Sequence, residues 1–284
     1  MSAFKLVLPK GRIFEGVKQL LEDAGLKLSF SARSYFPRTS DPRIEAKIMK
    51  PQNIAQLVEL GSHDAGFTGR DWIVETEARV VEIMDLGLDP VRIVSAASPD
   101  FIRKGSPREK IVVASEYENI SRRYLSEKNW DFHFLRTHGA TEAFPPQDAD
   151  MIIDNTTTGQ TLSEHGLKIV DILLPSSTRF IADARALEVG WKRDLIEELR
   201  LLFEAVLNAR GRVLLEMNVP YEKLEGIVRV LPCLKAPTVA PLYDGFGYAV
   251  KAAVPREQAF ALIPLLKRLG ATDILEYEFR KVVL

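Results

Sequence analysis

The chain has 284 residues, of which 46% are hydrophobic and 27% are charged. This composition is ordinary for a folded globular protein and argues against intrinsic disorder. The 38 Lys and Arg residues nearly balance 39 Asp and Glu residues, so the formal net charge is −1. A neutral surface excludes nucleic acid and anionic membranes as partners of the surface as a whole. A chain of this length predicts two or three domains.

Cysteine content and hydropathy predict a cytoplasmic protein. The single cysteine, Cys233, excludes an intramolecular disulfide and a thiolate zinc site. The apolar stretch within residues 1–10 is interrupted by Lys5 and Pro9 and is too short for a signal peptide. The sequence contains no run of about 18 apolar residues, so no transmembrane helix is expected.

Short apolar runs alternate with helical repeats along the first half of the chain, and this order is typical of an α/β fold. Glycines at 25 and 61 follow two of the helical repeats, where they end helices well. The expected strands lie at 4–8, 44–48, 64–67, 111–114, 132–135, 151–153, 169–174 and 179–182. The expected helices lie at about 17–24, 51–60, 70–78 and 120–128.

A long helix is expected from 188 to about 209, with one apolar face, bridging the first part of the chain and the last. Strands are then expected at 213–217, 238–242, 248–254 and 274–282, with a turn at Asp244-Gly245. Helices are expected at 221–231 and from Pro255 onward, with a kink at Pro264. The order β-α-β-β-α-β predicts a ferredoxin-like domain.

The segment 154–161, Asp-Asn-Thr-Thr-Thr-Gly-Gln-Thr, is the most informative motif. It lies between a buried strand and residues that can begin a helix, so its amides and hydroxyls can converge on a phosphate. Asp154, at the end of the strand, is placed to accept hydrogen bonds from sugar hydroxyls. The segment is neither a Walker A motif nor G-x-G-x-x-G. A threonine-rich turn that only caps a helix is the alternative.

Two other segments carry weaker signals. Lys10 and Arg12 flank a glycine between a strand and a helix, where cations suit an anionic ligand; a solvated turn is the alternative. Residues 61–72 contain three glycines, which would leave room for a flat base. Thr68 with Asp71 resembles a capping pair, and the alternative is that the segment provides only an N-cap and tight packing. The four histidines have no metal-ligand spacing, and the sequence assigns no metal ligand.

Taken in order, these segments resemble the long form of ATP phosphoribosyltransferase, the first enzyme of histidine biosynthesis. The matching segments are 8–12, 61–72, 111–125, 139–145, 154–167 and 231–242. The resemblance implies that N1 of ATP attacks C1 of phosphoribosyl pyrophosphate (PRPP), giving phosphoribosyl-ATP and pyrophosphate, with Mg²⁺. Adenine is then the nucleophile, so no catalytic Ser or Cys is required.

The resemblance also implies roles for individual residues. Thr158, Gly159 and Thr161 would hold the 5′-phosphate of PRPP, and Asp154 would meet its ribose hydroxyls. Lys10 and Arg12 would face pyrophosphate or triphosphate oxygens. The remaining implied residues are Thr157 and Gln160 for PRPP, Glu142 for catalysis, and Gly11, Asp64, Gly69 and Asp71 for ATP.

The implied architecture is a two-lobed α/β catalytic part, similar to periplasmic binding proteins, followed by a ferredoxin-like α+β regulatory domain. Residues 1–92 and 184–211 would form the first lobe, 93–183 the second, and 212–284 the regulatory domain. Histidine would bind and inhibit there, within a hexamer built from dimers. The implied histidine contacts are Asn218, Leu234, Ala236 and Thr238.

Several positions depart from the family pattern. Asn155 stands where an apolar residue is usual, and Lys50 and Asn53 replace Arg and Asp. Asn218 and Ala236 stand where Asp and Ser are expected to contact histidine, which predicts weakened or retuned feedback. A catalytically silent two-lobed binder or sensor is the competing hypothesis. A transcriptional sensor is disfavoured because no basic helix-turn-helix is present.

Overall fold

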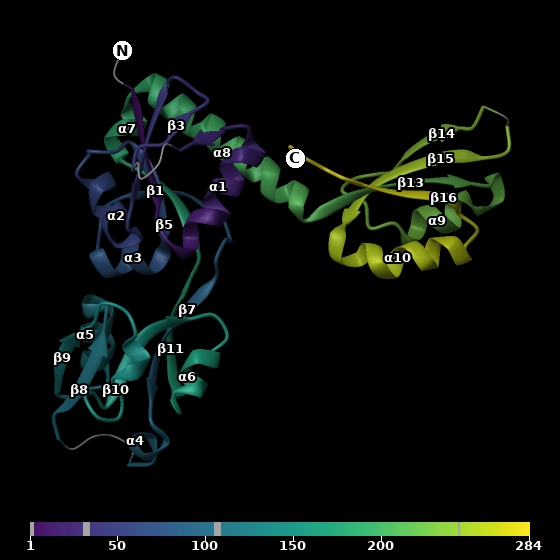
Figure 1. The fold of residues 1–284 in the computed structure, drawn as a ribbon. Helices are drawn as coiled ribbons and strands as arrows, with labels where there is room; N and C mark the ends of the chain where they lie inside the picture. The colour runs from purple at the N-terminus through teal and green to yellow at the C-terminus, as the bar shows by residue number, and fades with distance from the viewer. Residues whose placement is uncertain (1–2, 31–34, 105–108, 244) are drawn as a thin grey trace. The chain divides into compact units, whose positions relative to one another are not determined.

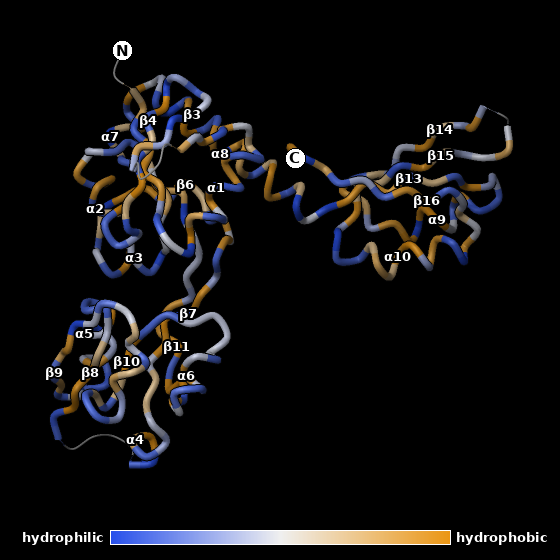
Figure 2. The backbone as a smooth tube through the Cα atoms, viewed as in Figure 1, coloured by the Kyte–Doolittle hydropathy of each residue, from blue (hydrophilic) through white to orange (hydrophobic). Residues whose placement is uncertain are grey.

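The computed structural model describes residues 3–30, 35–104, 109–243 and 245–284 (Figure 1). The fold is mixed α/β. The chain forms two compact units: residues Met1–Gln19 with Leu26–Ile196, and Leu20–Gly25 with Glu197–Leu284. Each unit has its own sheets and core. Hydrophobic segments follow the central strands, as the orange stretches along β1 and β7 in Figure 2 show.

The first unit contains a five-stranded sheet in the order β4-β1-β5-β12-β6. Strand β1 pairs in parallel with β4 and β5, whereas β12 is antiparallel to β5 and β6. The strands are β1 (Phe4–Pro9), β4 (Ile44–Met49), β5 (Ala65–Gly69), β6 (Val81–Asp85) and β12 (Thr178–Ala182). Its helices are α1 (Arg12–Ala24), α2 (Pro51–Glu59), α3 (Arg70–Thr76) and α7 (Ala184–Glu188). A two-stranded sheet joins β2 (Leu28–Ser29) and β3 (Arg38–Thr39).

A second five-stranded sheet of the same unit has the order β11-β7-β10-β8-β9. Two separate apolar clusters contain alternate residues of β10: Met151 and Ile153 in one, Ile152 in the other. The strands are β7 (Val91–Ala97), β8 (Ile111–Ser115), β9 (Phe132–Arg136), β10 (Met151–Thr156) and β11 (Lys168–Ser176). The helices are α4 (Pro99–Lys104), α5 (Glu118–Glu127), η1 (Thr141–Ala143) and α6 (Gln160–Glu164).

Two crossovers connect these sheets, one between β6 and β7 and the other between β11 and β12. The crossover from β6 to β7 is a short segment that includes Asp89 and Pro90, and the crossover from β11 to β12 consists of Ser177. Side chains from both sheets and both crossovers can therefore meet at one place.

The second unit has a four-stranded antiparallel sheet in the order β14-β15-β13-β16. Strand β13 alternates strictly, and Val213, Leu215, Met217 and Val219 are buried against residues of α9 and α10. The strands are β13 (Arg212–Val219), β14 (Thr238–Pro241), β15 (Tyr248–Pro255) and β16 (Thr272–Glu278). The helices are η2 (Tyr221–Lys223), α9 (Leu224–Val230) and α10 (Arg256–Arg268), and α8 (Gly190–Arg210) runs from the first unit into this one.

Most expected elements are confirmed, with shifted ends. The expected helix at 188–209 is two helices, since Val189 is extended between α7 and α8. The last strand ends at Glu278, not at 282, and the helix expected at 221–231 begins as a 3₁₀ turn. Pro255 is the residue before α10, and α10 continues through Pro264. The expected turn at Asp244 lies outside the described residues.

Strands β6 and β7 and helix α4 were not expected from the sequence. Strand β10 extends three residues beyond the expected 151–153, because Asp154, Asn155 and Thr156 pair with β7. Across the described ranges, no helix combines the length and apolar composition that a membrane span needs.

Candidate active site

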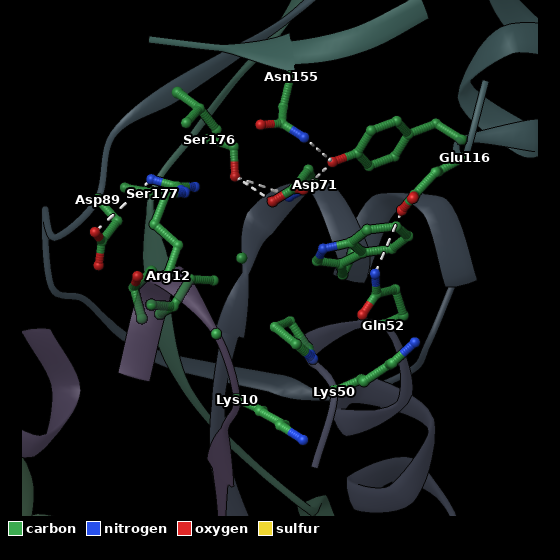
Figure 3. A pocket seen from close by; sticks show the side chains of 18 residues that line it. Lys10, Arg12, Lys50, Gln52, Asp71, Asp89, Glu116, Asn155, Ser176 and Ser177 are labelled. Atoms are coloured by element: carbon green, nitrogen blue, oxygen red, sulfur yellow. Dashed lines mark hydrogen bonds and ion pairs between the residues drawn. The ribbon is translucent and has the colours of Figure 1, made fainter. Parts of the chain in front are cut away.

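A cavity of about 390 Å³ lies where the first sheet, the second sheet and the crossovers meet (Figure 3). Strands β1, β4 and β5 run in parallel and end at Pro9, Met49 and Gly69, so the residues that follow them lie at one sheet edge. Ligands of open α/β sheets bind at such an edge. The polar lining residues are Lys10, Arg12, Lys50, Gln52, Asp71, Asp89, Glu116, Tyr117, Asn155, Ser176, Ser177 and Thr178.

The first sheet gives the cavity three cations. Lys10 and Arg12 follow β1, where Gly11 adopts a left-handed φ of 82° that favours glycine. Arg12 is half exposed and its Nη1 lies 3.7 Å from Asp89 Oδ1. Lys50 precedes α2. These cations can therefore meet a polyanionic ligand.

Asp71 lies at the centre of a buried hydrogen-bond network. Its Oδ1 accepts from Ser176 Oγ at 2.6 Å and its Oδ2 accepts from the Tyr117 hydroxyl at 2.8 Å. Tyr117 in turn accepts from Asn155 Nδ2 at 3.2 Å. Because an amide nitrogen only donates, the Tyr117 proton is directed to Asp71. Burial, followed by the charge of Asp71, raises the pKa of Tyr117 well above its ordinary value.

The prediction that Thr68 and Asp71 form a capping pair is wrong. Residue Gly69 precedes α3 without a side-chain cap, and the Thr68 hydroxyl instead donates to Pro51 O at 2.9 Å. Asp71 is bonded to Ser176, which is 105 residues away in the sequence. Its carboxylate therefore joins α3 to the crossover rather than capping its own helix.

Further contacts join the two sheets beside the cavity. The rings of Trp72 and Tyr117 stack with centroids 4.6 Å apart. Gln52 Nε2 donates to Glu116 Oε2 at 3.4 Å. Glu75 accepts from the backbone amides of Asn119 and Ile120, and burial raises its pKa. Helix α3 is thereby anchored to the start of α5, which fixes one wall of the site.

Asp154 lies on β10 and carries an unusual pKa. Burial is the largest cause that raises the pKa of Asp154 to about 7, and the charges of Glu142 and Glu116 raise it further. The backbone amide of Asn155 donates to Asp154 Oδ1 at 2.7 Å and acts in the opposite direction. Asp154 can therefore change its protonation near neutral pH, and a positive charge nearby would favour its ionised form.

The predicted phosphate loop is an exposed turn between β10 and α6. Gly159 has a φ of 85°, and its amide donates to Thr156 Oγ1 at 2.9 Å. Thr157 lines a neighbouring cavity that shares Ser176 and Ser177 with the first. The exposed loop residues are Thr157, Thr158, Gln160 and Thr161.

The cavity thus brings together Lys10, Gly11, Arg12, Gly69 and Asp71 of the predicted residues. Asp154, Glu142, Thr158, Gly159, Gln160 and Thr161 do not line it, although Asp154 is next to Asn155, which does. Asp64 is buried elsewhere, where Lys192 Nζ lies 2.6 Å away and the amide of Lys5 donates at 2.8 Å. The predicted regulatory residues belong to the second unit.

Sequence reasoning missed several lining residues. They are Gln52, Trp72, Asp89, Glu116, Tyr117, Ser176, Ser177 and Thr178. All three of Trp72, Glu116 and Tyr117 belong to segments already singled out, and Glu116 and Tyr117 come shortly after the strand expected at 111–114, which is a usable signal in an α/β fold. Nothing comparable marks Ser176 or Ser177.

The described residues contain no group of three or more His, Cys, Asp or Glu side chains that could hold a metal ion. Mg²⁺ usually keeps several waters and binds one or two carboxylates together with substrate phosphates. Asp154 with Glu142 or Glu116 fits that limited role.

Comparisons with known proteins identify the family of the chain. A family model described as ATP phosphoribosyltransferase matches residues 50–205, and one described as the HisG C-terminal domain matches 209–281. ATP phosphoribosyltransferases from Prosthecochloris aestuarii and Pelotomaculum thermopropionicum are 39% and 38% identical, each over 98% of this chain and over 97% and 99% of their own.

A solved structure, the ATP phosphoribosyl transferase (HisG:HisZ) complex from Thermotoga maritima, contains a similar chain. It is 25% identical with a TM-score of 0.64, over 71% of this chain and 98% of that one. On these matches, which span nearly the whole sequence, the chain belongs to the ATP phosphoribosyltransferase family.

Proposed function

We propose that this chain transfers the phosphoribosyl group of PRPP to N1 of ATP, releasing pyrophosphate, as the first step of histidine biosynthesis. The observation that carries the proposal is the cavity itself, because it gathers Lys10, Arg12 and Lys50 on one side and the Asp71–Tyr117–Asn155 network on the other. The lining also contains three carboxylates, Asp71, Asp89 and Glu116, so the cations matter by their position beside one another rather than by an excess of charge.

The N1 lone pair of adenine forms the new bond to C1 of the sugar as the C1–O bond breaks. The electron pair of the broken bond leaves with pyrophosphate, so no protein nucleophile is used. Positive charge develops on the sugar in the transition state, as in glycoside cleavage. In our proposal ionised Asp154 faces the ribose and stabilises that charge, and Lys10 and Arg12 neutralise the leaving phosphates. Glu142 keeps a supporting role beside Asp154.

Recognition of the substrates follows from the same residues. We assign Thr157, Thr158, Gly159, Gln160 and Thr161 to the 5′-phosphate of PRPP, and Gly11, Gly69 and Asp71 to ATP. Asp64, bonded to Lys192 and Lys5, receives a structural role instead. Mg²⁺, when bound, would neutralise phosphate oxygens, with Asp154 and Glu142 as the protein's carboxylates.

Regulation and assembly are also proposed. We infer a two-lobed catalytic part similar to periplasmic binding proteins, with lobes at 1–92 plus 184–211 and 93–183, and a ferredoxin-like regulatory domain at 212–284. The enzyme would be a cytoplasmic hexamer. Histidine would bind the regulatory domain and contact Asn218, Leu234, Ala236 and Thr238. Asn218 Nδ2 donates to Asp273 Oδ2 at 2.9 Å, so a carboxylate stands beside the position where one was expected.

The test mixes the protein with ATP, PRPP, Mg²⁺ and pyrophosphatase, and follows the near-ultraviolet absorbance of N1-alkylated adenine. We expect turnover that histidine suppresses, and at least a tenfold slower rate for Lys10→Ala. No turnover by protein shown to be folded and assembled would reject the transferase and favour the catalytically silent binder.

A further inference from the structure

A second cavity, of about 580 Å³, adjoins the first at the crossovers. It shares Val91, Ser176 and Ser177 with the first cavity, and it reaches the start of the predicted phosphate loop at Thr157. Its charged lining residues are Arg70, Arg92, Arg179 and Asp85. Neither the family resemblance nor the comparisons assign a role to these four side chains.

The cavity carries more positive charge than its one acid can balance. Asp85 Oδ2 pairs with Arg179 Nη1 at 2.8 Å, and Asp85 Oδ1 accepts from Ser177 Oγ at 2.7 Å and from the Gly87 amide at 2.9 Å. Asp85 thus forms its ion pair with Arg179, and the positive charge of Arg70 also lowers the pKa of Asp85. Glu82 Oε2, just outside the cavity, also lies 3.7 Å from Arg179 Nε, so three guanidinium groups and two carboxylates leave about one uncompensated positive charge.

Arg70 and Arg92 are the free members of this group. Both are half-buried, and the guanidinium of neither makes a hydrogen bond or an ion pair with any described residue. A half-buried guanidinium without an acceptor is costly, and an anion in the cavity would relieve that cost. The guanidinium fork also matches phosphate oxygens in a bidentate manner.

The backbone holds both arginines near the loop and the crossover. Arg92 pairs with Thr156 in the β7–β10 ladder, directly before Thr157. The amide of Arg70 donates to Ser177 O at 3.1 Å, which ties the start of α3 to the crossover. Arg70 follows a strand of the first sheet and Arg92 belongs to the second, so the two cations approach the cavity from different sheets.

We propose that Arg70 and Arg92, together with Thr157, bind phosphate oxygens of PRPP. This inference rests on the proposed function and deepens it, because it adds two cations that bind PRPP beside the loop, apart from those that face its leaving group. Lys10, Arg12 and Lys50 line the first cavity with Asp71, whereas Arg70 and Arg92 line the second with the PRPP loop. The loop end of PRPP then has a cationic group of its own in the second cavity, separated by the shared serines from the cations of the first.

The test is calorimetric titration of PRPP with Mg²⁺, and separately of ATP, into wild-type protein and single variants, with no second substrate present. We expect Arg70→Gln and Arg92→Gln each to weaken PRPP binding about tenfold or more, and ATP binding less than twofold. Arg92→Lys retains the charge but not the fork, so an intermediate loss is expected.

Arg103→Gln is the matched control, since Arg103 is exposed on α4, pairs with Asp100 and lines neither cavity. This variant also removes one positive charge, from a helix beside the second sheet. We expect it to bind both substrates as tightly as the wild-type protein does. Circular dichroism checks that each variant is folded.

Unchanged PRPP affinity in folded Arg70→Gln and Arg92→Gln would overturn the inference, as would an equal loss of PRPP and ATP binding. Both results leave the proposed function standing, provided that wild type binds both substrates. Wild-type protein that binds neither substrate would instead reject the proposed function, and this inference with it.

Discussion

The cavity of the first unit and the predicted regulatory residues of the second are built differently. Around the cavity, Asp71, Tyr117 and Ser176 are buried and held by hydrogen bonds between residues 46 and 105 positions apart. In the second unit, Leu234, Ala236 and Thr238 are exposed and Asn218 is half-buried. Asn218 and Thr238 belong to the sheet, and the Asn218 side chain donates to Asp273 Oδ2.

The two sets of residues differ in how far their side chains are held in place before a ligand binds. Buried polar networks hold donors and acceptors in place before a ligand arrives, and catalysis depends on that. Exposed side chains pay the cost of ordering when a ligand binds, so they suit weaker and reversible control. Changes at the cavity should therefore affect turnover strongly, and changes in the second unit should affect only inhibition.

The largest effect is expected at Asp154. Asp154→Asn removes the charge proposed to stabilise the sugar cation, so we expect kcat to fall about hundredfold or more. Wild-type kcat/KM should rise with pH through about 7, where Asp154 ionises. The residual rate of the variant should lack that rise, measured from pH 5.5 to 8.5 at one fixed Mg²⁺ concentration. An equally pH-dependent variant would assign the ionisation to another group.

The same substitution, Asp154→Asn, is expected to stabilise the folded protein although it slows the reaction. Burial raises the pKa of folded Asp154 to about 7 from an ordinary value of 3.8. Between these values the folded state retains a proton that the unfolded state has lost, so Asp154 lowers stability increasingly as pH rises from about 4 to about 7. In urea unfolding, Asp154→Asn should be more stable than wild type at pH 8, with a smaller gain at pH 4. A gain independent of pH would contradict this.

An intermediate effect is expected at Tyr117. Tyr117→Phe deprives Asp71 of a donor and removes one of the two acceptors of Asn155 Nδ2, the other being Asp154 Oδ1 at 3.3 Å. We expect kcat/KM for ATP to fall about tenfold and the free energy of unfolding to fall by about 1–3 kcal/mol.

Tyr124→Phe is the matched control for this network. The Tyr124 hydroxyl also bonds a carboxylate, Asp171 at 2.7 Å, and a serine, Ser95 at 3.1 Å, but it does not line the first cavity. We expect lower stability with little change in turnover. If the two variants lost the same activity, the Asp71 network would be a packing feature rather than part of the site.

The smallest effect on catalysis is expected in the second unit. Asp273→Ala removes the carboxylate beside Asn218, so we expect the histidine concentration for half-inhibition to rise about tenfold, with the uninhibited rate unchanged. Asp273→Asn keeps a polar partner for Asn218 without the charge, and it separates electrostatic from structural causes. Unaltered histidine sensitivity in both variants would remove Asp273 from the regulatory proposal.

Periodicity predicted those elements whose residues carry their own pattern. The alternating apolar residues of β13 and the helical repeat of α1 are confirmed. Strand β7 was missed because its last residues, Ser95, Ala96 and Ala97, have little intrinsic strand preference. They are extended because β7 lies between β10 and β11, which is a property of the assembled sheet.

The candidate site follows the same rule. Lys10, Arg12 and Asp71 lie in local motifs at strand ends, and the structure places them at one cavity. Tyr117 and Ser176 join that cavity through contacts with residues far away in the sequence, which no local pattern encodes. Arg70 and Arg92 likewise meet only because the crossovers join the two sheets.

The most direct test of the account is a crystal structure of the enzyme with phosphoribosyl-ATP. The account predicts the ligand in the cavity lined by Lys10, Asp71 and Asn155, with its ribose hydroxyls within hydrogen-bonding distance of Asp154. Ligand bound elsewhere, with this cavity left to solvent, would contradict the claim that phosphoribosyl transfer takes place here.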